Sequence, residues 1–386
     1  MSYERCGVGC IIAVMALGLF FWEDPTLAPP TMAATKKVFG TLSDGRVVNA
    51  FTLSDGPITV VAVEYGATLI SLLAPDRNGN AQEITVCHAT LEELQHGLPQ
   101  CYYGATVGRV GNRIKNGQFK LPNKDTTSYA LPTNNGPNCL HGGNVGFDKR
   151  LWTGEILDNQ NSVKFSLVSQ DGDQGFPGQV AASITYSLTE GKTLRLQYEA
   201  TSTKPTPLAL TNHTYWNLSG NSSQNILEHK LTMPATTYLP VDATSIPVGT
   251  ATVENTPFDF RATHTLGERI ADIGGDPGGY DHCYVNVNVD TSSESGSSGE
   301  ARTTVMDVAT VECTASGRTM HVASDQPGVQ LYTGNYMDGE GAHSKHGGLC
   351  LETQAFPDAI NQWPDQVVLL PNQTWTSTTV HTFGVV

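Results

Sequence analysis

Short runs in which apolar and polar residues alternate recur along this chain, and they constrain its fold more than any other feature. In residues 193–199, Thr-Leu-Arg-Leu-Gln-Tyr-Glu, every second side chain is apolar, as in a β-strand with one buried face. Turn clusters rich in glycine and aspartate separate such runs, for example at 171–175 and 274–279. This pattern predicts an all-β fold in which antiparallel sheets form a sandwich. Further runs lie at 58–63, 163–168, 306–313 and 329–333.

The composition agrees with such a fold and narrows the class of ligand. The chain of 386 residues has 39 glycines and 21 prolines, and only 15% of its residues are charged, which suits a turn-rich β protein. One short helix is predicted at 90–95, where Thr90 and Glu93 form a capping-box pattern. The formal net charge of −15 disfavours nucleic acid, anionic membrane surfaces and polyphosphates as ligands. We therefore expect a neutral small molecule.

Residues 6–22 form an uninterrupted apolar stretch that follows a single basic side chain, Arg5. The stretch is typical of a signal peptide or a short membrane anchor, and a buried helix is the alternative. We expect residues 1–35 to be this segment plus a linker, and residues 36–386 to form one domain, a monomer or weak dimer. The segment predicts a secretory or membrane-anchored protein if it acts as a signal, and a cytoplasmic one otherwise. Residues 290–299, rich in serine and glycine, are interpreted as a flexible insert.

Six of the cysteines lie in the body of the chain, at positions 87, 101, 139, 283, 313 and 350. Cys139, Cys283 and Cys350 each stand two residues from a candidate site residue named below, and in a strand such pairs share a face. These thiols should therefore line the same interior as the site. Buried, reduced cysteine is the favoured interpretation, ahead of a disulfide framework.

Two strand-like segments each carry one titratable side chain. His213 lies in residues 211–220, Thr-Asn-His-Thr-Tyr-Trp-Asn-Leu-Ser-Gly, and Glu352 lies in residues 347–354, Gly-Gly-Leu-Cys-Leu-Glu-Thr-Gln. A lone histidine in an aromatic strand is more often structural, but a carboxylate buried without a partner among leucines is costly. An acid and a base on separate strands predict a proton-transfer site that needs no cofactor.

Three other segments offer groups suited to a polyhydroxylated ligand. Residues 108–114 present Asn112 beside Arg113, and residues 140–143 place His141 before two glycines that let the backbone approach a ligand closely. Residues 279–284 bring Asp281 out of a glycine-rich turn into a strand, and Gln330 adds an amide from another strand. Each of these motifs is weak alone, because surface ion pairs and turn caps use the same residues. Together they are far more specific.

In combination, these segments resemble the aldose 1-epimerase (galactose mutarotase) family. Eight segments follow the family's order and cover nearly everything from residue 36 onward: 108–114, 140–143, 169–178, 211–220, 257–261, 279–284, 327–335 and 346–361. The resemblance implies a large antiparallel β-sandwich of the galactose mutarotase type, with the sugar in a cleft on one sheet. The departures are the N-terminal apolar stretch, the insert, and Gly111 where an alanine is usual.

The resemblance also implies an activity and roles for the residues. It implies interconversion of the α and β anomers of aldohexoses such as galactose and glucose, without cofactor or metal. Glu352 would be the base and His213 the acid. Substrate hydroxyls and ring oxygen would be held by Asn112, Arg113, His141, Asp281 and Gln330.

Ring opening needs a proton removed from the C1 hydroxyl and another delivered to the ring oxygen. A carboxylate can do the first, and an imidazolium can do the second near neutral pH. Trp216, Phe147 or Tyr215 could offer a face to the sugar, although core packing is expected for at least two of them.

Four other functions stay open at this point. One is a hexose-6-phosphate 1-epimerase, and another is a non-catalytic sugar-binding module anchored by residues 6–22. A metal hydrolase lacks support because no H-E-x-x-H spacing occurs in the sequence. A glycosidase would need two carboxylates flanking the scissile bond, and Asp281 and Glu352 are the candidates for them.

Overall fold

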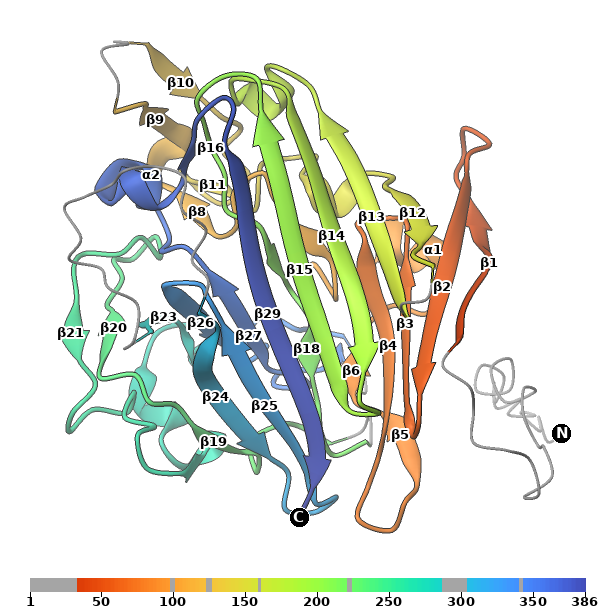
Figure 1. Ribbon diagram of the computed structural model, residues 1–386. Coiled ribbons are helices and arrows are strands. Elements are labelled where there is room, and N and C mark those ends of the chain that lie inside the picture. Colours follow the sequence, from red (N-terminus) through yellow and green to blue (C-terminus); the bar gives the residue numbers. More distant parts are fainter. Residues whose placement is uncertain are drawn as a thin grey trace, which may run out of the picture.

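The computed structural model describes residues 33–97, 101–122, 127–158, 161–220, 224–286, 304–339 and 343–386. The apolar stretch at 6–22 and the insert at 290–299 lie outside the described residues. Across the described ranges, no helix is long and apolar enough to cross a membrane. Strands dominate the architecture (Figure 1), and the predicted all-β class with few short helices is confirmed.

The largest sheet has nine strands, and the last strand of the chain, β29, runs through its centre (Figure 1). Side chains alternate between buried and exposed along the whole of β15, as the sequence predicts. In order across the sheet, the strands are β12 (Thr153–Ile156), β13 (Ser162–Ser169), β14 (Val180–Thr189), β15 (Thr193–Ser202), β29 (Thr374–Val385), β25 (Arg318–Ser324), β24 (Met306–Glu312), β19 (Lys230–Thr232) and β22 (His264–Thr265).

Two five-stranded sheets accompany it. The first contains β1 (Ala33–Thr41), β2 (Val47–Asp55), β3 (Ile58–Val63), β4 (Thr68–Pro75) and β5 (Ala81–Glu83). The second has the order β21 (Ala251–Thr252), β20 (Thr237–Leu239), β23 (Asp281–Val285), β26 (Gly328–Tyr332) and β27 (Cys350–Gln354). One large core packs side chains of all three sheets together, including Phe51, Phe165 and Tyr284.

Five short two-stranded sheets complete the fold. They are β6 (Thr85–Val86) with β18 (Tyr215–Trp216), β7 (Thr106–Val107) with β17 (Thr211–Asn212), β8 (Arg113–Ile114) with β11 (Cys139–Leu140), β9 (Gln118–Lys120) with β10 (Ser128–Ala130), and β16 (Thr206–Pro207) with β28 (Val368–Leu369). Among these strands, β17 and β18 pack against β27 of the second five-stranded sheet.

Two α-helices, α1 (Leu91–His96) and α2 (Ala359–Gln362), are both short. The predicted capping box is present before α1: the Thr90 hydroxyl accepts from the Glu93 backbone N–H at 3.2 Å, and the Glu93 carboxylate accepts from the Thr90 N–H at 3.0 Å. Single 3₁₀ turns are η1 (Lys115–Gly117), η2 (Phe147–Lys149), η3 (Asp173–Gly175), η4 (Leu266–Glu268), η5 (Ile270–Ile273) and η7 (Pro364–Gln366).

All six cysteines among the described residues are free thiols, as expected. Five of them are buried, and Cys87 is half-buried. They therefore act as small apolar side chains, and the packing of the sheets stabilises the fold without a covalent cross-link between these positions.

Candidate active site

The register of the second five-stranded sheet places several candidate residues on one face. Gln330 in β26 pairs directly with Glu352 in β27, and two residues along β26, Tyr332 pairs with Asp281 in β23. Directly opposed residues, and residues two apart in one strand, point to the same side of a sheet. Asp281, Gln330 and Glu352 therefore project together although about 70 residues separate the first from the last.

His213 reaches this face because its segment lies against β27. Thr211 donates from its hydroxyl to the carbonyl of Thr353 at 3.0 Å, and Trp216 exchanges two backbone hydrogen bonds with Leu349, at 2.7 and 2.9 Å. These contacts fix the segment on both sides of His213. The imidazole is held opposite the middle of β27, where Glu352 stands.

The paired strands β8 and β11 bring Asn112 and His141 together, because Asn112 precedes β8 and His141 follows β11. Both residues adopt unusual backbone conformations. Asn112 and His141 have φ of 60° and 50°, in the left-handed region that side chains other than glycine seldom occupy. His141 donates its N–H to the Asn112 carbonyl at 3.0 Å, and Nδ1 of His141 accepts the Asn112 N–H at 3.1 Å. Each residue thus holds the other in a strained conformation, which is common at functional sites.

These side chains surround a cavity of about 520 Å³, within the range typical of small-molecule sites. Six of the seven candidate residues line it, namely Asn112, Arg113, His141, His213, Asp281 and Glu352. Gln330 lies behind Asp281 instead, where its amide donates to the Asp281 carboxylate at 2.6 Å. The cavity therefore unites the predicted acid, the predicted base and most of the predicted binding residues.

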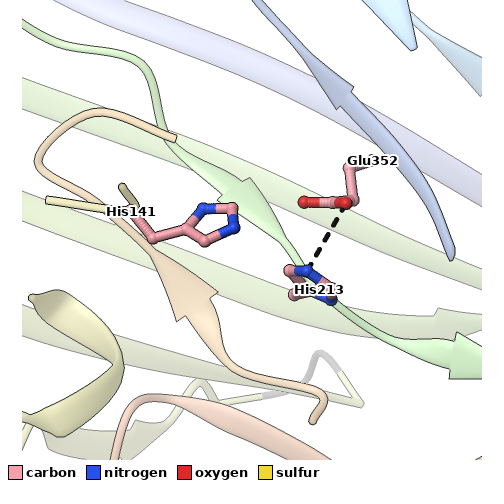
Figure 2. A group of neighbouring side chains, drawn as sticks. All are labelled: His141, His213 and Glu352. Carbon is pink, nitrogen blue, oxygen red and sulfur yellow. Dashed lines mark ion pairs between the residues drawn. The ribbon is translucent and has the colours of Figure 1, made fainter. Parts of the chain in front are cut away.

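His213 and Glu352 form a buried ion pair in this cavity (Figure 2). Nε2 of His213 lies 3.5 Å from Oε1 of Glu352, and their exposed fractions are only 5% and 2%. Oε2 of Glu352 is buried without a hydrogen-bond partner. Such an unsatisfied acceptor is costly unless a ligand donates to it. On the other side of the ring, Sγ of Cys350 lies 3.5 Å from Nδ1 of His213.

Burial shifts the protonation of both groups toward the neutral form. It lowers the pKa of His213 to about 4. It also raises the pKa of Glu352 well above its usual range, an effect that Asp281 adds to and Arg113 opposes. At neutral pH these shifts favour a neutral imidazole, and the imidazolium expected from the sequence requires transfer of the Glu352 proton to His213. The cause is desolvation, which disfavours a charge on either group.

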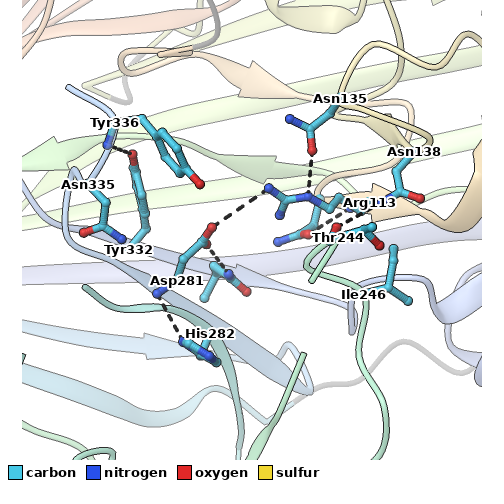
Figure 3. Close-up of polar contacts among 12 residues, drawn as sticks. Arg113, Asn135, Asn138, Thr244, Ile246, Asp281, His282, Tyr332, Asn335 and Tyr336 are labelled. Atoms are coloured by element: carbon cyan, nitrogen blue, oxygen red, sulfur yellow. Dashed lines mark hydrogen bonds and ion pairs between the residues drawn. The ribbon is translucent and has the colours of Figure 1, made fainter. Parts of the chain in front are cut away.

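A polar network forms the more open end of the cavity (Figure 3). Nε of Arg113 donates to Oδ1 of Asn135 at 3.0 Å, and its guanidinium lies 4.0 Å from the Asp281 carboxylate. Oε1 of Gln330 is buried without a hydrogen-bond partner. The network holds these groups in place while Asp281 keeps part of its surface exposed to the cavity.

Several lining residues are absent from the sequence-based prediction. Asn135 hydrogen-bonds to Arg113 but lies in a turn-rich stretch, Thr-Asn-Asn-Gly-Pro-Asn. In the sequence, only its position a few residues before His141 indicates that it belongs to the site. The rings of Tyr102 and His141 lie 4.5 Å apart between centroids. Tyr332, Tyr336 and the loop at 243–245 also line the cavity. These residues come from four separate segments of the chain, so the local sequence gives little indication that they share a cavity.

The three aromatic residues considered for sugar stacking occupy different environments. Phe147 and Trp216 are almost fully buried in the main core. Tyr215 lines the cavity, and its ring stacks on that of His213 with a centroid distance of 5.0 Å. The expectation that at least two of the three serve core packing is therefore confirmed.

The sequence matches the aldose 1-epimerase family over residues 49–382. The chain belongs to the aldose 1-epimerase family. It is 42% identical to galactose mutarotase from Mus musculus over 92% of this chain and 99% of that protein. With aldose 1-epimerase from Escherichia coli K12 it shares 32% identity over 94% of this chain and 98% of that protein.

Solved structures of aldose epimerases share the fold. Galactose 1-epimerase from Lactobacillus acidophilus NCFM superposes with a TM-score of 0.77 at 25% identity, covering 92% of this chain and 99% of that chain. An aldose epimerase homologue from C. elegans gives a TM-score of 0.74 at 30% identity, covering 85% and 96%. The predicted resemblance is confirmed, and membership of this epimerase family makes the protein an isomerase.

Proposed function

We propose that this protein interconverts the α and β anomers of aldohexoses such as galactose and glucose, with Glu352 and His213 exchanging the protons. The observation that carries the proposal is the buried pair 3.5 Å apart that lines the cavity, in which one carboxylate oxygen has no hydrogen-bond partner. An anomeric hydroxyl is a hydrogen-bond donor of the kind that this oxygen lacks. Family membership supports the same reaction.

The reaction balances with one proton held by the pair. In ring opening, the Glu352 carboxylate takes the proton of the C1 hydroxyl. At the same time, the bond between C1 and the ring oxygen breaks, and Nε2–H of His213 gives its proton to that oxygen. The product is an open aldehyde with a protonated Glu352 and a neutral His213. After rotation about C1–C2, the same two transfers run backwards and close the ring on the other face of C1.

Burial favours a state in which Glu352 holds the proton, and this is the state that the open-chain stage of the reaction requires. The shifted pKa values of the two residues favour a protonated carboxyl beside a neutral imidazole. The ion pair needed for ring opening has the same number of protons and differs only in which residue holds one. Hydroxyl donors of a bound sugar stabilise the carboxylate and so favour the ion pair. Proton transfer between the residues therefore suffices to prepare the site.

The remaining side chains suit the part of the sugar that does not react. We infer that Asn112, Arg113, His141 and Asp281 bind its hydroxyls and ring oxygen, and that Gln330 acts on the sugar through Asp281. This division leaves C1 free to rotate while the other end of the sugar is held. Hydrogen-bonded positioning of this kind can lower a barrier by several kcal/mol.

A hexose 6-phosphate is a poorer fit to this cavity. Among the described residues that line it, Arg113 is the one arginine or lysine, and Asn135 and Asp281 already surround its guanidinium. A dianionic phosphate is usually held by more than one free cationic or N–H donor. The neutral sugar is therefore the proposed substrate.

Optical rotation of freshly dissolved α-D-galactose tests the proposal. We expect relaxation to the anomeric equilibrium to accelerate in proportion to the concentration of purified protein, and α-D-glucose to be tried beside it. Binding of the sugar without acceleration would instead indicate a non-catalytic module. Acceleration confined to hexose 6-phosphate would indicate the phosphorylated substrate.

A further inference from the structure

We propose that the ring of Tyr215 acts on the reaction through His213, by stabilising the protonated imidazole that gives its proton to the ring oxygen of the sugar. This inference rests on the proposed function, because it assigns a role to a neighbour of the proposed acid. The two rings are stacked, with their centroids 5.0 Å apart and an angle of 23° between their planes. Tyr215 is therefore a positioning residue, whose effect on the sugar passes through the imidazole.

Backbone pairing and packing hold the two rings in this arrangement. Tyr215 lies in β18, where it pairs with Val86 of β6, and His213 lies two residues earlier in the same segment. The Tyr215 side chain is 1% exposed and belongs to a small buried cluster with Cys350 and Tyr332. The stacking therefore comes from a segment that is fixed on both sides, and it does not depend on an exposed side chain.

The face of an aromatic ring favours the charged form of a stacked imidazole. The face carries negative charge, so it attracts a cation within about 6 Å of the ring centroid, and most strongly where water is excluded. Burial of His213 disfavours its charged form, and the face of Tyr215 offsets part of that cost. Burial also raises the pKa of Tyr215 well above its usual range, so the phenol stays neutral and acts through its ring. The ion pair needed for ring opening is therefore easier to form.

Tyr102 offers a weaker form of the same contact. Its ring is also stacked on that of His213, with a centroid distance of 5.8 Å and an angle of 26° between the planes. Nζ of Lys149 lies 5.5 Å from the centroid of the Tyr102 ring, so this ring already interacts with a cation. The longer distance and the second cation both reduce what Tyr102 can contribute. We therefore expect a larger effect from Tyr215.

Other titratable side chains also face His213, and a test must leave them unchanged. Negative charge on a carboxylate favours the imidazolium, and positive charge on a second imidazole opposes it. These side chains are Glu352 and Cys350 in β27, Asp281 in β23, Tyr332 in β26, Tyr102, and His141 after β11. A substitution that alters only the charge distribution of the Tyr215 ring leaves all of them in place.

Tyr215→Phe, followed by phenylalanines of increasing fluorine content at the same position, tests the proposal in the full-length protein. Fluorine withdraws negative charge from the face of the ring and changes its shape little. From phenylalanine to pentafluorophenylalanine, we expect kcat to fall stepwise, by about 10-fold in total at constant KM. NMR titration of the sugar-free protein should show the pKa of His213 fall by about 1 pH unit across the series. His213→Asn assigns the NMR signal.

Tyr238 is the matched control, because its ring stacks on that of Phe258 with a centroid distance of 4.1 Å, outside the cavity lining. The same series at position 238 should change neither kcat nor the pKa of His213. Circular dichroism establishes that each variant is folded. Equal kcat and equal pKa of His213 for phenylalanine and pentafluorophenylalanine at position 215 would overturn the proposal. If the variants at 215 do not fold, the series at Tyr102 decides: kcat should fall about 3-fold, and an unchanged kcat would equally overturn it.

The two readouts separate this inference from the proposed function. If the protein fails to accelerate mutarotation but the pKa of His213 follows the fluorine content at position 215, the stabilisation of the imidazolium stands and the proposed reaction fails. If the protein accelerates mutarotation but the pKa of His213 does not follow the fluorine content, the role of Tyr215 fails and the proposed reaction stands.

Discussion

The two ends of the cavity differ in how far their charged side chains are exposed. At the deep end, Glu352 and His213 are almost fully buried, and one carboxylate oxygen has no partner. At the open end, Arg113 and Asp281 keep more exposure and lie within a network completed by Asn135. The shifted pKa values of His213 and Glu352 suit the deep end to proton transfer. The hydrogen-bonded geometry of Arg113 suits the open end to binding. Substitutions at the deep end should therefore change turnover, and those at the open end should change affinity.

The largest effect is expected for Glu352→Gln. It removes the base but keeps the size and polarity of the side chain, so kcat should fall about 10⁴-fold while sugar affinity changes little. Polarimetry gives kcat and calorimetry gives the affinity. Glu64→Gln is the control, because Glu64 is also buried but accepts hydrogen bonds from Asn49, remote from the cavity. Retention of most activity in Glu352→Gln would remove this residue as the base.

His213→Asn should lower kcat about 10³-fold, because it removes the acid that serves the ring oxygen. His229→Asn is the matched control, since His229 is equally buried and accepts the Leu218 N–H at 2.9 Å away from the cavity. We expect the control to keep its turnover per folded molecule. An unaffected kcat in His213→Asn would mean that another group supplies the proton.

Arg113→Met tests the open end of the cavity. Loss of a charged hydrogen-bond donor to a sugar hydroxyl should raise KM by about 10- to 100-fold, with a smaller change in kcat. Arg150→Met is the control, because Arg150 pairs with Asp173 at 2.5 Å outside the cavity lining. A large fall in kcat with KM unchanged would contradict the division between the two ends.

The pH dependence of kcat/KM reports on the deep end. Catalysis requires one proton on the pair, and His213, with its pKa lowered to about 4, takes up a second proton only below that value. We therefore expect kcat/KM to fall about tenfold per pH unit below pH 4. It should fall again at alkaline pH, once Glu352 loses its proton above its raised pKa. Circular dichroism at each pH controls for unfolding, and an acid limb near pH 6.5 would contradict the shift of His213.

The smallest effect is expected for Cys350→Ala. Burial raises the pKa of the Cys350 thiol, so its S–H can donate to Nδ1 of His213 and leave the ring proton on Nε2. Loss of this weak hydrogen bond should lower kcat about 3-fold at constant KM. Cys350→Ser should restore activity because a hydroxyl also donates, and Cys283→Ala is the control. Equal activity of the alanine and serine variants at Cys350 would exclude this positioning role.

Much of the fold is predictable because apolar and polar residues alternate in the sequence wherever one face of a strand is exposed to solvent. β15 shows this pattern over its whole length, and the run at 193–199 lies within it. The short strands β17 and β18 show no such signal. Their partners β7 and β6 lie more than a hundred residues earlier in the sequence, so tertiary pairing decides their conformation.

The candidate site is predictable only in part, for a related reason. His213 and Glu352 stand out locally, because polar groups in apolar, aromatic strands are hard to explain as packing. Their shifted protonation depends on burial by distant segments, so the lowered pKa of His213 cannot be predicted from the local sequence. Asn135 escapes prediction because its importance comes from one hydrogen bond with Arg113, 22 residues earlier in the sequence.

The register that pairs Gln330 with Glu352 has a consequence for insertions and deletions. Side chains alternate between the two faces of a sheet, so shifting β27 by one residue would turn Glu352 away from the cavity and bring Leu351 or Thr353 to its place, depending on the direction. A shift of two residues would keep the facing and move Cys350 or Gln354 into the row of the base. An insertion or deletion of one residue within β27 is therefore expected to abolish turnover, because it removes the carboxylate from the cavity.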